Sequence, residues 1–345
     1  MRDDRAVTAS DPVLDAPRGA RPRRQHRWVW VTALTIVGLL LGVAVAAFAY
    51  LATLASSYDQ AETMPTNEVF PTTRPPATNP KAVNILLLGS DSRSGLGGSV
   101  SDIRGQRADT MLLVHIPADR SGVQIISFMR DNWVEIPGHG EAKLNAALAY
   151  GGTPLLVQTL ESIVDVRIDH VAITDFEGFK GLSTALDGVT VNNEVAFSKG
   201  GHRYEQGPIE LQGDAALGYV RERYSFPDGD YQRVRNQQAF IKGMLDKLVS
   251  RETLTDPARI AASVDALAPY LAVDEGLDAG TVAALGLSLR DVDKSEILFL
   301  TSPTHGTGTV GSQSIVRPDW DGLAALSQAL KDDKVPEYAA THTGQ

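Results

Sequence analysis

The sequence predicts an α/β protein: a three-layer α-β-α arrangement with a mixed central sheet, after one N-terminal transmembrane helix. Three observations predict it. From about residue 81 onward, short apolar runs alternate with longer segments of helical periodicity. The run at 83–88 (VNILLL) is continuously apolar, as in a strand buried on both faces. Residues 28–58 contain no charged side chain, and a membrane span needs only about 20 residues.

The uncharged segment has the flanks of a signal anchor. Arginine residues precede it at positions 18, 21, 23, 24 and 27, and the first charges after it are Asp59 and Glu62. By the positive-inside rule, the N-terminus is cytoplasmic and the folded part of the chain is extracytoplasmic. A cleaved signal peptide is an alternative, but its apolar core is normally only about 7–15 residues long. A buried soluble helix is the other alternative. The prediction is a single-pass protein of the cell membrane.

Composition divides the chain into five parts. Residues 1–27 are a disordered cytoplasmic tail, 28–54 the transmembrane helix, and 55–80 an extracytoplasmic linker rich in Pro and Thr. Residues 81–335 are expected to form one folded domain, and 336–345 a flexible C-terminal tail.

Within the folded domain, periodicity and turn signals predict each element in order. A turn at 119–122 precedes a strand, Pro154 suits a first helical turn, and Asp187-Gly188 ends a helix. The expected strands are 83–88, 111–116, 123–128, 171–173, 189–195 and 296–300. The expected helices are 141–150, 154–164, 176–186, 230–251, 259–271, 279–289 and 320–331.

Composition excludes several classes of function. The chain has no cysteine, and its seven histidines form no metal-binding cluster, which excludes thiolate zinc sites and cysteine nucleophiles. The sequence also lacks GxxxxGK[ST] and GxSxG. The net charge is −10, and residues 1–27 carry +3, so the remainder carries −13. Such an acidic domain argues against a nucleic-acid partner.

Two carboxylates are candidates for a metal site. Asp91 follows the first strand, and Asp109 enters the next one together with Arg107. If these two strands pair antiparallel, the end of one adjoins the start of the other, which brings the two carboxylates close. Without His or Cys nearby, they suit a hard cation such as Mg²⁺. Ordinary turn carboxylates beside a solvated loop are the alternative.

Cationic side chains and one amide form the second candidate group. If extended, the chain at 221–223 places Arg221 and Arg223 on one side, and a helix places Arg233 and Gln237 on one face. Arg130 and Lys143 follow the strand at 123–128. The planar fork of arginine matches phosphate oxygens. For each cation taken alone, the alternative is a surface residue paired with a nearby acid.

Six ordered blocks resemble the LytR-CpsA-Psr family. They are NILLLGSDSR, RADTMLLVHI, SFMRDNWVEIPG, KLNAALAYGG, DFEGFKGLSTALDGVTV and LQGDAALGYVRERYSFPDGDYQRVRNQQAF, which run over about residues 82–240. The resemblance continues more weakly to about residue 331. Two positions depart from the family pattern: Met129 stands where proline is common, and Asn236 where arginine is common.

The resemblance implies an extracytoplasmic, Mg²⁺-dependent phosphotransferase. Such enzymes move a cell-wall glycopolymer, teichoic-acid-like, capsular or arabinogalactan-like, from a polyprenyl-pyrophosphate carrier to a peptidoglycan hydroxyl, forming a phosphodiester. Their partners are therefore the carrier-linked glycan, the peptidoglycan acceptor and membrane lipid. An apolar groove accepts the prenyl chain. A polyprenyl-pyrophosphate lipid pyrophosphatase, or a non-catalytic lipid-binding or transcription-attenuating protein, is the alternative.

The resemblance also implies roles for individual residues. Asp91 and Asp109 are expected to hold the metal, and either of them to draw the proton from the sugar hydroxyl. These two, with Arg107 and Arg130, form the expected catalytic group. The expected pyrophosphate-binding residues are Arg107, Arg130, Lys143, Arg221, Arg223, Arg233 and Gln237.

Overall fold

The computed structural model describes residues 39, 42, 45–46, 48–90 and 108–342. The chain divides into two compact units, Met1–Ala52 and Thr53–Gln345. The predicted cytoplasmic tail and most of the predicted transmembrane helix at 28–54 lie outside the described residues. Within the part that is described, no helix combines the length and the apolar character needed to cross a membrane. The membrane anchor therefore stays a prediction.

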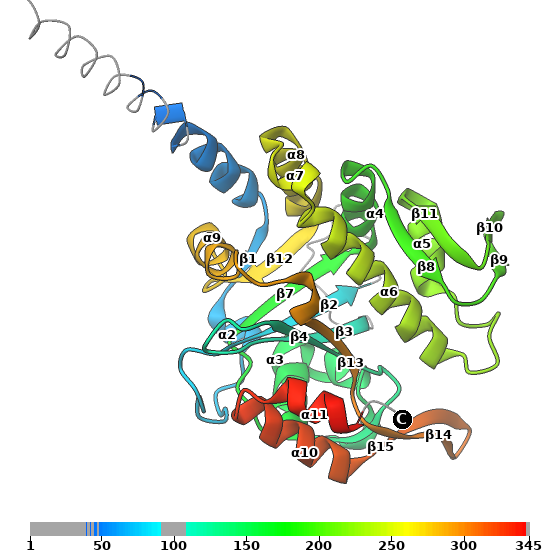
Figure 1. Ribbon diagram of the computed structural model, residues 1–345. Coiled ribbons are helices and arrows are strands. Elements are labelled where there is room, and N and C mark those ends of the chain that lie inside the picture. The colour runs from blue at the N-terminus through cyan, green and yellow to red at the C-terminus, as the bar shows by residue number, and fades with distance from the viewer. Residues whose placement is uncertain (1–38, 40–41, 43–44, 47, 91–107, 343–345) are drawn as a thin grey trace, which may run out of the picture. The chain divides into compact units, whose positions relative to one another are not determined.

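A mixed sheet forms the centre of the second unit (Figure 1). In the described chain it has seven strands in the order β1-β12-β7-β2-β3-β4-β13. The pairs β1/β12, β7/β2 and β4/β13 are parallel, and the other neighbours are antiparallel. This confirms the predicted mixed α/β fold. The bounds are β1 Glu62–Met64, β12 Leu271–Asp274, β7 His170–Asp175, β2 Val83–Ser90, β3 Ala108–Ile116, β4 Val123–Phe128 and β13 Ile297–Thr301.

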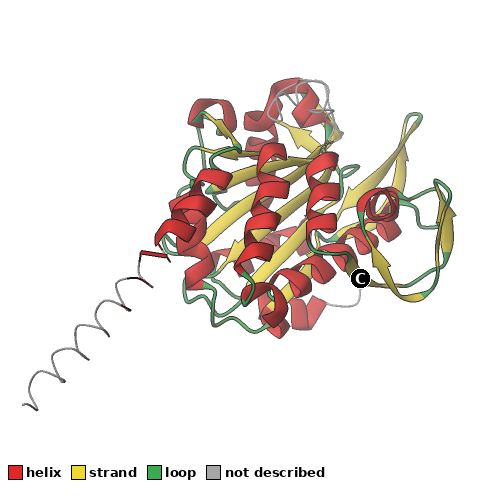
Figure 2. Cartoon of the chain, turned by 90° about the horizontal axis from the view of Figure 1, so that it is seen from above, coloured by secondary structure: helices red, strands yellow, loops and turns green. Residues whose placement is uncertain are grey.

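Helices cover both faces of this sheet (Figures 1 and 2). One face carries α3 (Ala146–Val164), α10 (Trp320–Lys331) and α11 (Val335–His342). The other carries α4 (Phe176–Ala185), α6 (Asp230–Leu248), α8 (Pro257–Leu267) and α9 (Ala279–Ser288). Three short helical elements connect these larger ones. They are α7 (Arg251–Leu254) between α6 and α8, a 3₁₀ turn at Ala268–Tyr270 after α8, and a 3₁₀ turn at Lys294–Glu296 before β13. Burial of apolar side chains between these layers provides the main driving force for folding.

The largest core cluster lies between the sheet and α3 with α10. Leu86 and Leu88 of β2 point into it and are almost fully buried, whereas Leu87 between them is 36% exposed on the other face. Leu156 of α3 and Leu326 of α10 pack against the same strands. The alternation along β2 follows from the period of two in a strand. One face of β2 therefore forms the core, and the other remains partly open.

A second cluster lies against α6, away from the main sheet. It is built from α5 (Gly213–Arg221) with two small hairpins, β8 (Val189–Asn193) with β11 (Gly207–Leu211), and β9 (Phe197–Lys199) with β10 (His202–Tyr204). Tyr204 and Phe240 are fully buried there, and the Tyr204 hydroxyl donates to the Ala215 carbonyl oxygen at 2.9 Å. This cluster holds the C-terminal end of α5 in place.

The predicted helix at 141–150 is wrong in its first half. Residues 140–143 form β6 (Gly140–Lys143), which pairs with β5 (Trp133–Ile136) in a hairpin. Gly138 and Gly140 have φ of +77° and +71°, which glycine adopts without strain, so the hairpin turn is possible here. Helix α3 begins at Ala146 and is kinked at Gly151 and Gly152, so the two predicted helices form one interrupted element.

Other predicted elements are present with shifted bounds. The predicted helix at 230–251 ends at Leu248, and the predicted helix at 259–271 runs from Pro257 to Leu267 as α8, followed by the unpredicted strand β12. A hairpin of β14 (Thr304–Val310) and β15 (Gln313–Pro318) was also not predicted. These elements are short or rich in Thr, Ser and Gly, so their local pattern is weak.

The predicted spacer and C-terminal tail are packed against the domain. In the 55–80 segment, β1 joins the sheet edge, and α2 (Thr66–Val69) buries Val69 completely. Arg74 makes an ion pair of 2.7 Å with the buried Glu161 of α3. At the other end, residues 335–342 form α11, which buries Val335 and Ala339. Single apolar or ion-paired side chains anchor both segments, and composition does not reveal such contacts.

Candidate active site

A cationic pocket of about 190 Å³ lies where β7 ends and β3 begins. Its wall holds four guanidinium groups and one carboxylate, in a chain whose net charge is −10. The lining residues are Asp109, Thr110, Arg130, Phe176, Val220, Arg221, Arg223, Tyr224, Arg233 and Gln237. An anion is therefore the ligand that this pocket favours.

Antiparallel pairing of β2 with β3 places Asp109 beside the end of β2, as predicted. Gly89 is opposite Thr110, and Ser90 is opposite Ala108. Asp91 follows Ser90 directly and Arg107 precedes Ala108, but both lie outside the described residues and stay predictions. The Asp109 carboxylate accepts a hydrogen bond from Nη1 of Arg130 and keeps 18% of its side chain exposed.

Arg233 places an unpaired donor inside the protein. It is only 4% exposed, and its Nη2 donates to Oδ2 of Asp230 at 2.7 Å. Its Nε is buried without a hydrogen-bond acceptor among the described residues. Nε of Arg130 likewise makes no hydrogen bond to them, although Oδ2 of Asp131 lies 3.7 Å away. Burial lowers the pKa of Arg233, and the nearby Asp230 carboxylate opposes this change. Buried donors without acceptors are rare in native proteins, so these two indicate a ligand rich in oxygen acceptors.

Arg221 and Arg223 approach the same pocket from the end of α5. The prediction of an extended chain is wrong for Arg221, which is the last residue of α5, yet both side chains still line the pocket. The Arg221 guanidinium lies 4.4 Å from the ring centroid of Phe176, and Arg221 has no acidic partner in the described part of the chain. Arg223 donates from Nη2 to the Tyr224 hydroxyl at 2.6 Å. That hydrogen bond lowers the pKa of the exposed Tyr224 phenol.

Of the two remaining predicted residues that the structure describes, Gln237 lines the cationic pocket and Lys143 does not. Gln237 lies one helical turn after Arg233 on the same face of α6, as predicted, and its Nε2 donates to the Val220 carbonyl oxygen at 3.3 Å. Lys143, at the end of β6, does not line the cationic pocket. Its Nζ lies 3.0 Å from Oδ1 of Asp131 in the neighbouring pockets.

Sequence reasoning missed four lining residues, Thr110, Phe176, Val220 and Tyr224. Thr110 and Phe176 each occupy the position next to a recognised feature: Thr110 follows Asp109, and Phe176 follows the end of β7. Tyr224 follows Arg223 and is 79% exposed. A large exposed aromatic side chain beside two arginines is the signal that could have identified Tyr224.

The two departures from the family pattern lie away from the pocket. Asn236 is buried on α6, where it donates to the Tyr219 carbonyl oxygen and accepts from Gln232. Met129 is fully buried in a small cluster with Val234 and Val316. Neither side chain lines the cationic pocket, so neither departure changes its charge.

An apolar pocket of about 170 Å³ adjoins the cationic one. The two share Thr110, Phe176, Val220 and Gln237. The rest of its wall comes from the open face of the sheet and from α4 and α6, mainly Leu87, Leu112, Phe179, Ile241 and Met244. An anion-binding pocket therefore opens beside an apolar one, an arrangement that suits an amphiphilic ligand.

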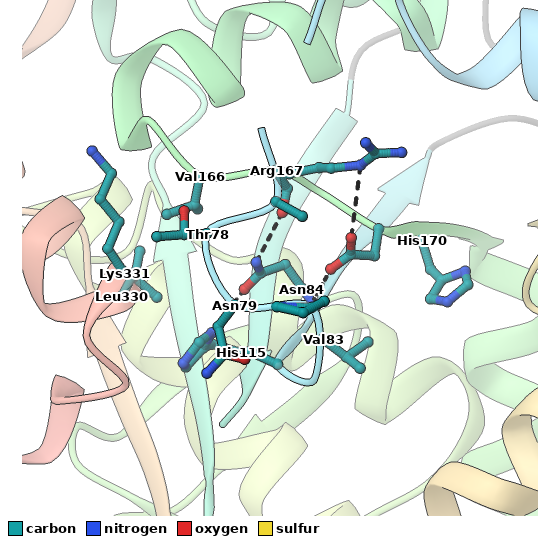
Figure 3. A pocket seen from close by; sticks show the side chains of 14 residues that line it. Thr78, Asn79, Val83, Asn84, His115, Val166, Arg167, His170, Leu330 and Lys331 are labelled. Atoms are coloured by element: carbon teal, nitrogen blue, oxygen red, sulfur yellow. Dashed lines mark hydrogen bonds and ion pairs between the residues drawn. The ribbon is translucent and has the colours of Figure 1, made fainter. Parts of the chain in front are cut away.

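A further pocket of about 320 Å³ lies at the opposite end of β2 (Figure 3). None of the predicted site residues lines it. Its polar groups are largely paired with one another. The side-chain Nδ2 of Asn84 donates to the Arg167 carbonyl oxygen at 2.8 Å, and the backbone N–H of Asn84 donates to Oδ2 of Asp169 at 2.9 Å. These groups hold the start of β2 to the loop before β7, so we assign them a structural role.

The chain matches the LytR_cpsA_psr family model over residues 45–332, most of its length. The protein belongs to this family. It is 34% identical over 187 residues to polyisoprenyl-teichoic acid--peptidoglycan teichoic acid transferase TagU of Enterococcus faecalis, covering 54% of this chain and 60% of the relative. It is 28% identical over 297 residues to the cell wall biosynthesis protein LcpA of Corynebacterium glutamicum, a match that covers 74% of this chain and 57% of LcpA. The matches thus span less than two thirds of these relatives' length.

Solved structures of the family share the fold. Protein gbs0355 of Streptococcus agalactiae superposes with a TM-score of 0.64 at 26% identity, covering 74% of this chain and 88% of the other. Bacillus subtilis TagV superposes with a TM-score of 0.62 at 22% identity, covering 74% of this chain and 98% of TagV. The mixed sheet with helices on both faces is therefore the fold of the family.

Proposed function

We propose that this protein is a phosphotransferase that moves a cell-wall glycopolymer from a polyprenyl-pyrophosphate carrier to a peptidoglycan hydroxyl. One observation carries the proposal. Buried guanidinium donors on Arg130 and Arg233, which make no hydrogen bond to the described residues, converge with Arg221 and Arg223 on one pocket beside an apolar pocket. Membership of the LytR_cpsA_psr family and the names of its relatives, a teichoic acid transferase and a cell wall biosynthesis protein, support the same reaction.

The two adjoining pockets match the two chemical parts of such a carrier. The pyrophosphate would lie among the guanidinium groups of the cationic pocket, with Gln237 at the boundary. The first isoprene units would extend into the apolar pocket between Leu87, Leu112 and the α6 residues Ile241 and Met244. Charge-assisted hydrogen bonds would hold one end, and burial of apolar surface the other.

The reaction is a transfer of a glycan-bearing phosphoryl group. The acceptor hydroxyl oxygen forms a bond to that phosphorus, the bond to the bridging pyrophosphate oxygen breaks, and prenyl phosphate leaves with the electron pair. The positive side chains around the pocket stabilise the negative charge that develops on the leaving group. Asp109, or the predicted partner Asp91, would accept the proton of the hydroxyl.

The described residues also fit a divalent cation. The described residues would supply only part of a site for it: Asp109 is the one carboxylate in the pocket and it also pairs with Arg130, and no cluster of three metal-binding side chains is present among them. Mg²⁺ is typically bound by one or two carboxylates together with phosphate oxygens. Asp109 with the predicted Asp91 would hold the ion. When bound, it would neutralise charge on the pyrophosphate oxygens.

The proposed location follows from the carrier. A prenyl chain is confined to a lipid bilayer, and the predicted signal anchor would place the domain on the extracytoplasmic side. Enzyme and carrier would then diffuse in the same plane.

The test is a transfer assay with the full-length protein purified in detergent. The donor is a synthetic polyprenyl-pyrophosphate glycan, and the acceptor is a peptidoglycan oligosaccharide. We expect a phosphodiester product that requires Mg²⁺ and that Asp109→Asn reduces roughly 100-fold, because a charged ligand to the metal is lost. Asp246→Asn, at a half-exposed position on α6 outside the pocket, is the control. Phosphate release without transfer would instead indicate a lipid pyrophosphatase, and binding without turnover a non-catalytic role.

A further inference from the structure

Another pocket, of about 440 Å³, adjoins the cationic site. It shares Arg130 and Arg223 with the cationic pocket and none of the lining residues of the apolar one. Its outer wall comes from the β5–β6 hairpin, the first turns of α3 and the tip of β15. Its volume lies within the range of about 300–1,000 Å³ that is usual for ligand pockets.

Two aromatic side chains line this wall. Trp133 of β5 is partly exposed, and its indole Nε1 donates to Oε2 of Glu141 at 3.3 Å across the hairpin. Tyr150 is 53% exposed and stacks on His139 of the hairpin turn, with ring centroids 4.9 Å apart. The kink at 151–152 follows Tyr150 directly, so the first turns of α3 are oriented separately from the rest of the helix. Both rings are therefore held in place while part of each remains accessible.

Asn145 places an unused amide in the same pocket. It is the N-cap residue of α3, where an asparagine side chain normally accepts a hydrogen bond from the helix, yet its side chain makes no capping bond. The residue is 5% exposed, and its side-chain amide, which makes no hydrogen bond to other described residues, is not fully buried but reaches the pocket. An amide that lines a pocket without an internal hydrogen bond can donate to and accept from a ligand there.

We propose that Trp133, Tyr150 and Asn145 form a saccharide-binding subsite next to the reacting phosphate. A pyranose ring has an apolar C–H face, which packs on an aromatic ring, and hydroxyl groups, which pair with an amide that both donates and accepts. Glu141 and Lys143 add an acceptor and a donor on the same wall. Lipid, phosphate and sugar would then occupy three consecutive pockets.

This inference deepens the proposed function and rests on it for the role of the sugar. The pocket chemistry alone suits either glycan of the reaction, the first sugars of the donor or the acceptor strand. Two probes distinguish these sources: a peptidoglycan tetrasaccharide for the acceptor, and N-acetylglucosamine 1-phosphate for the donor end.

The experiment measures saccharide binding by titration calorimetry and saturation-transfer NMR, using the full-length protein without carrier lipid. We expect Tyr150→Ala and Asn145→Ala each to raise the Kd of a bound saccharide roughly 3- to 10-fold, the loss typical of one stacked ring or one hydrogen bond. Trp320→Ala is the matched control, because Trp320 is also 53% exposed but lies at the start of α10, away from this pocket.

The outcomes separate this inference from the proposed function. Weaker binding of the tetrasaccharide by the variants supports an acceptor subsite, and weaker binding of the sugar phosphate alone supports a donor subsite. The inference is overturned if the wild type binds neither probe, or if both variants bind like Trp320→Ala. Saccharide binding that depends on Tyr150, in a wild type that transfers no glycan, would refute the transferase proposal while leaving the subsite in place.

Discussion

Arg221 allows the sharpest test of the cationic pocket, because its removal separates activity from stability. The side chain is exposed, has no acidic partner within the described residues, and contacts mainly the Phe176 ring at 4.4 Å. An exposed cation–π contact contributes only about 0.5–1 kcal/mol, so Arg221→Ala should lower the Tm by no more than a few degrees. A charge-assisted hydrogen bond to a phosphate is worth about 1.5–3 kcal/mol. At about 1.4 kcal/mol per tenfold, we expect kcat/KM to fall roughly 10- to 150-fold.

The assay compares kcat/KM for glycan transfer in wild type, Arg221→Ala, Arg221→Lys and Arg235→Ala. Arg221→Lys keeps the charge but loses the planar fork, so it should lie between wild type and alanine. Arg235 is the control, because it lies two residues after Arg233 but pairs with Glu194 and Asp228 outside the pocket. If Arg221→Ala keeps its kcat/KM within about twofold of wild type, the pocket does not hold the reacting phosphates.

Three further predictions test other parts of the structure. Because Arg223 donates to the Tyr224 hydroxyl, the phenolate is stabilised and Tyr224 should ionise below the ordinary pKa of 10.0; Arg223→Ala should raise that pKa again, as measured by ultraviolet difference titration against Tyr224→Phe. Arg74→Ala leaves Glu161, 2% exposed, without its charged partner and should lower the free energy of unfolding by about 3–5 kcal/mol in urea denaturation, whereas the half-exposed Arg167→Ala should change it little; equal stabilities would mean that the Arg74–Glu161 ion pair contributes nothing to the stability of the domain. Gly243→Ala would place a Cβ 2.3 Å from the Thr190 carbonyl oxygen and should cost about 1–3 kcal/mol, while Gly286→Ala, with open space at the new Cβ, should stabilise its helix by about 0.5–1 kcal/mol in the same assay.

Much of the main sheet was predictable because its central strands are continuous apolar runs in the sequence. The apolar runs at 83–88, 111–116 and 123–128 correspond to β2, β3 and β4, since strands in the middle of a sheet carry mostly apolar side chains, although one face of β2 remains partly open. The β5–β6 hairpin and β12 were missed. The first depends on glycines with positive φ, and the second is a four-residue strand whose place in the sheet is set by its neighbours β1 and β7.

In the candidate site too, the features that follow from local pattern were predictable, and those that depend on distant segments were not. Helical spacing alone places Arg233 and Gln237 on one face of α6, and antiparallel pairing places Asp109 at the end of β2. The separation of Lys143 from the cationic pocket was not predictable, because it depends on a hairpin that local pattern did not indicate.

The sequence by itself determined the family, the fold class and the residue types that the proposed chemistry requires, because apolar periodicity and ordered motifs are local properties of a chain. Only the tertiary structure decided which cations share a pocket, that Arg221 lies on Phe176, and that Asn145 lines one pocket with Trp133 and Tyr150. These features depend on contacts between segments far apart in the sequence. Such contacts are set by how the helices and hairpins pack on the sheet, and no local pattern records them.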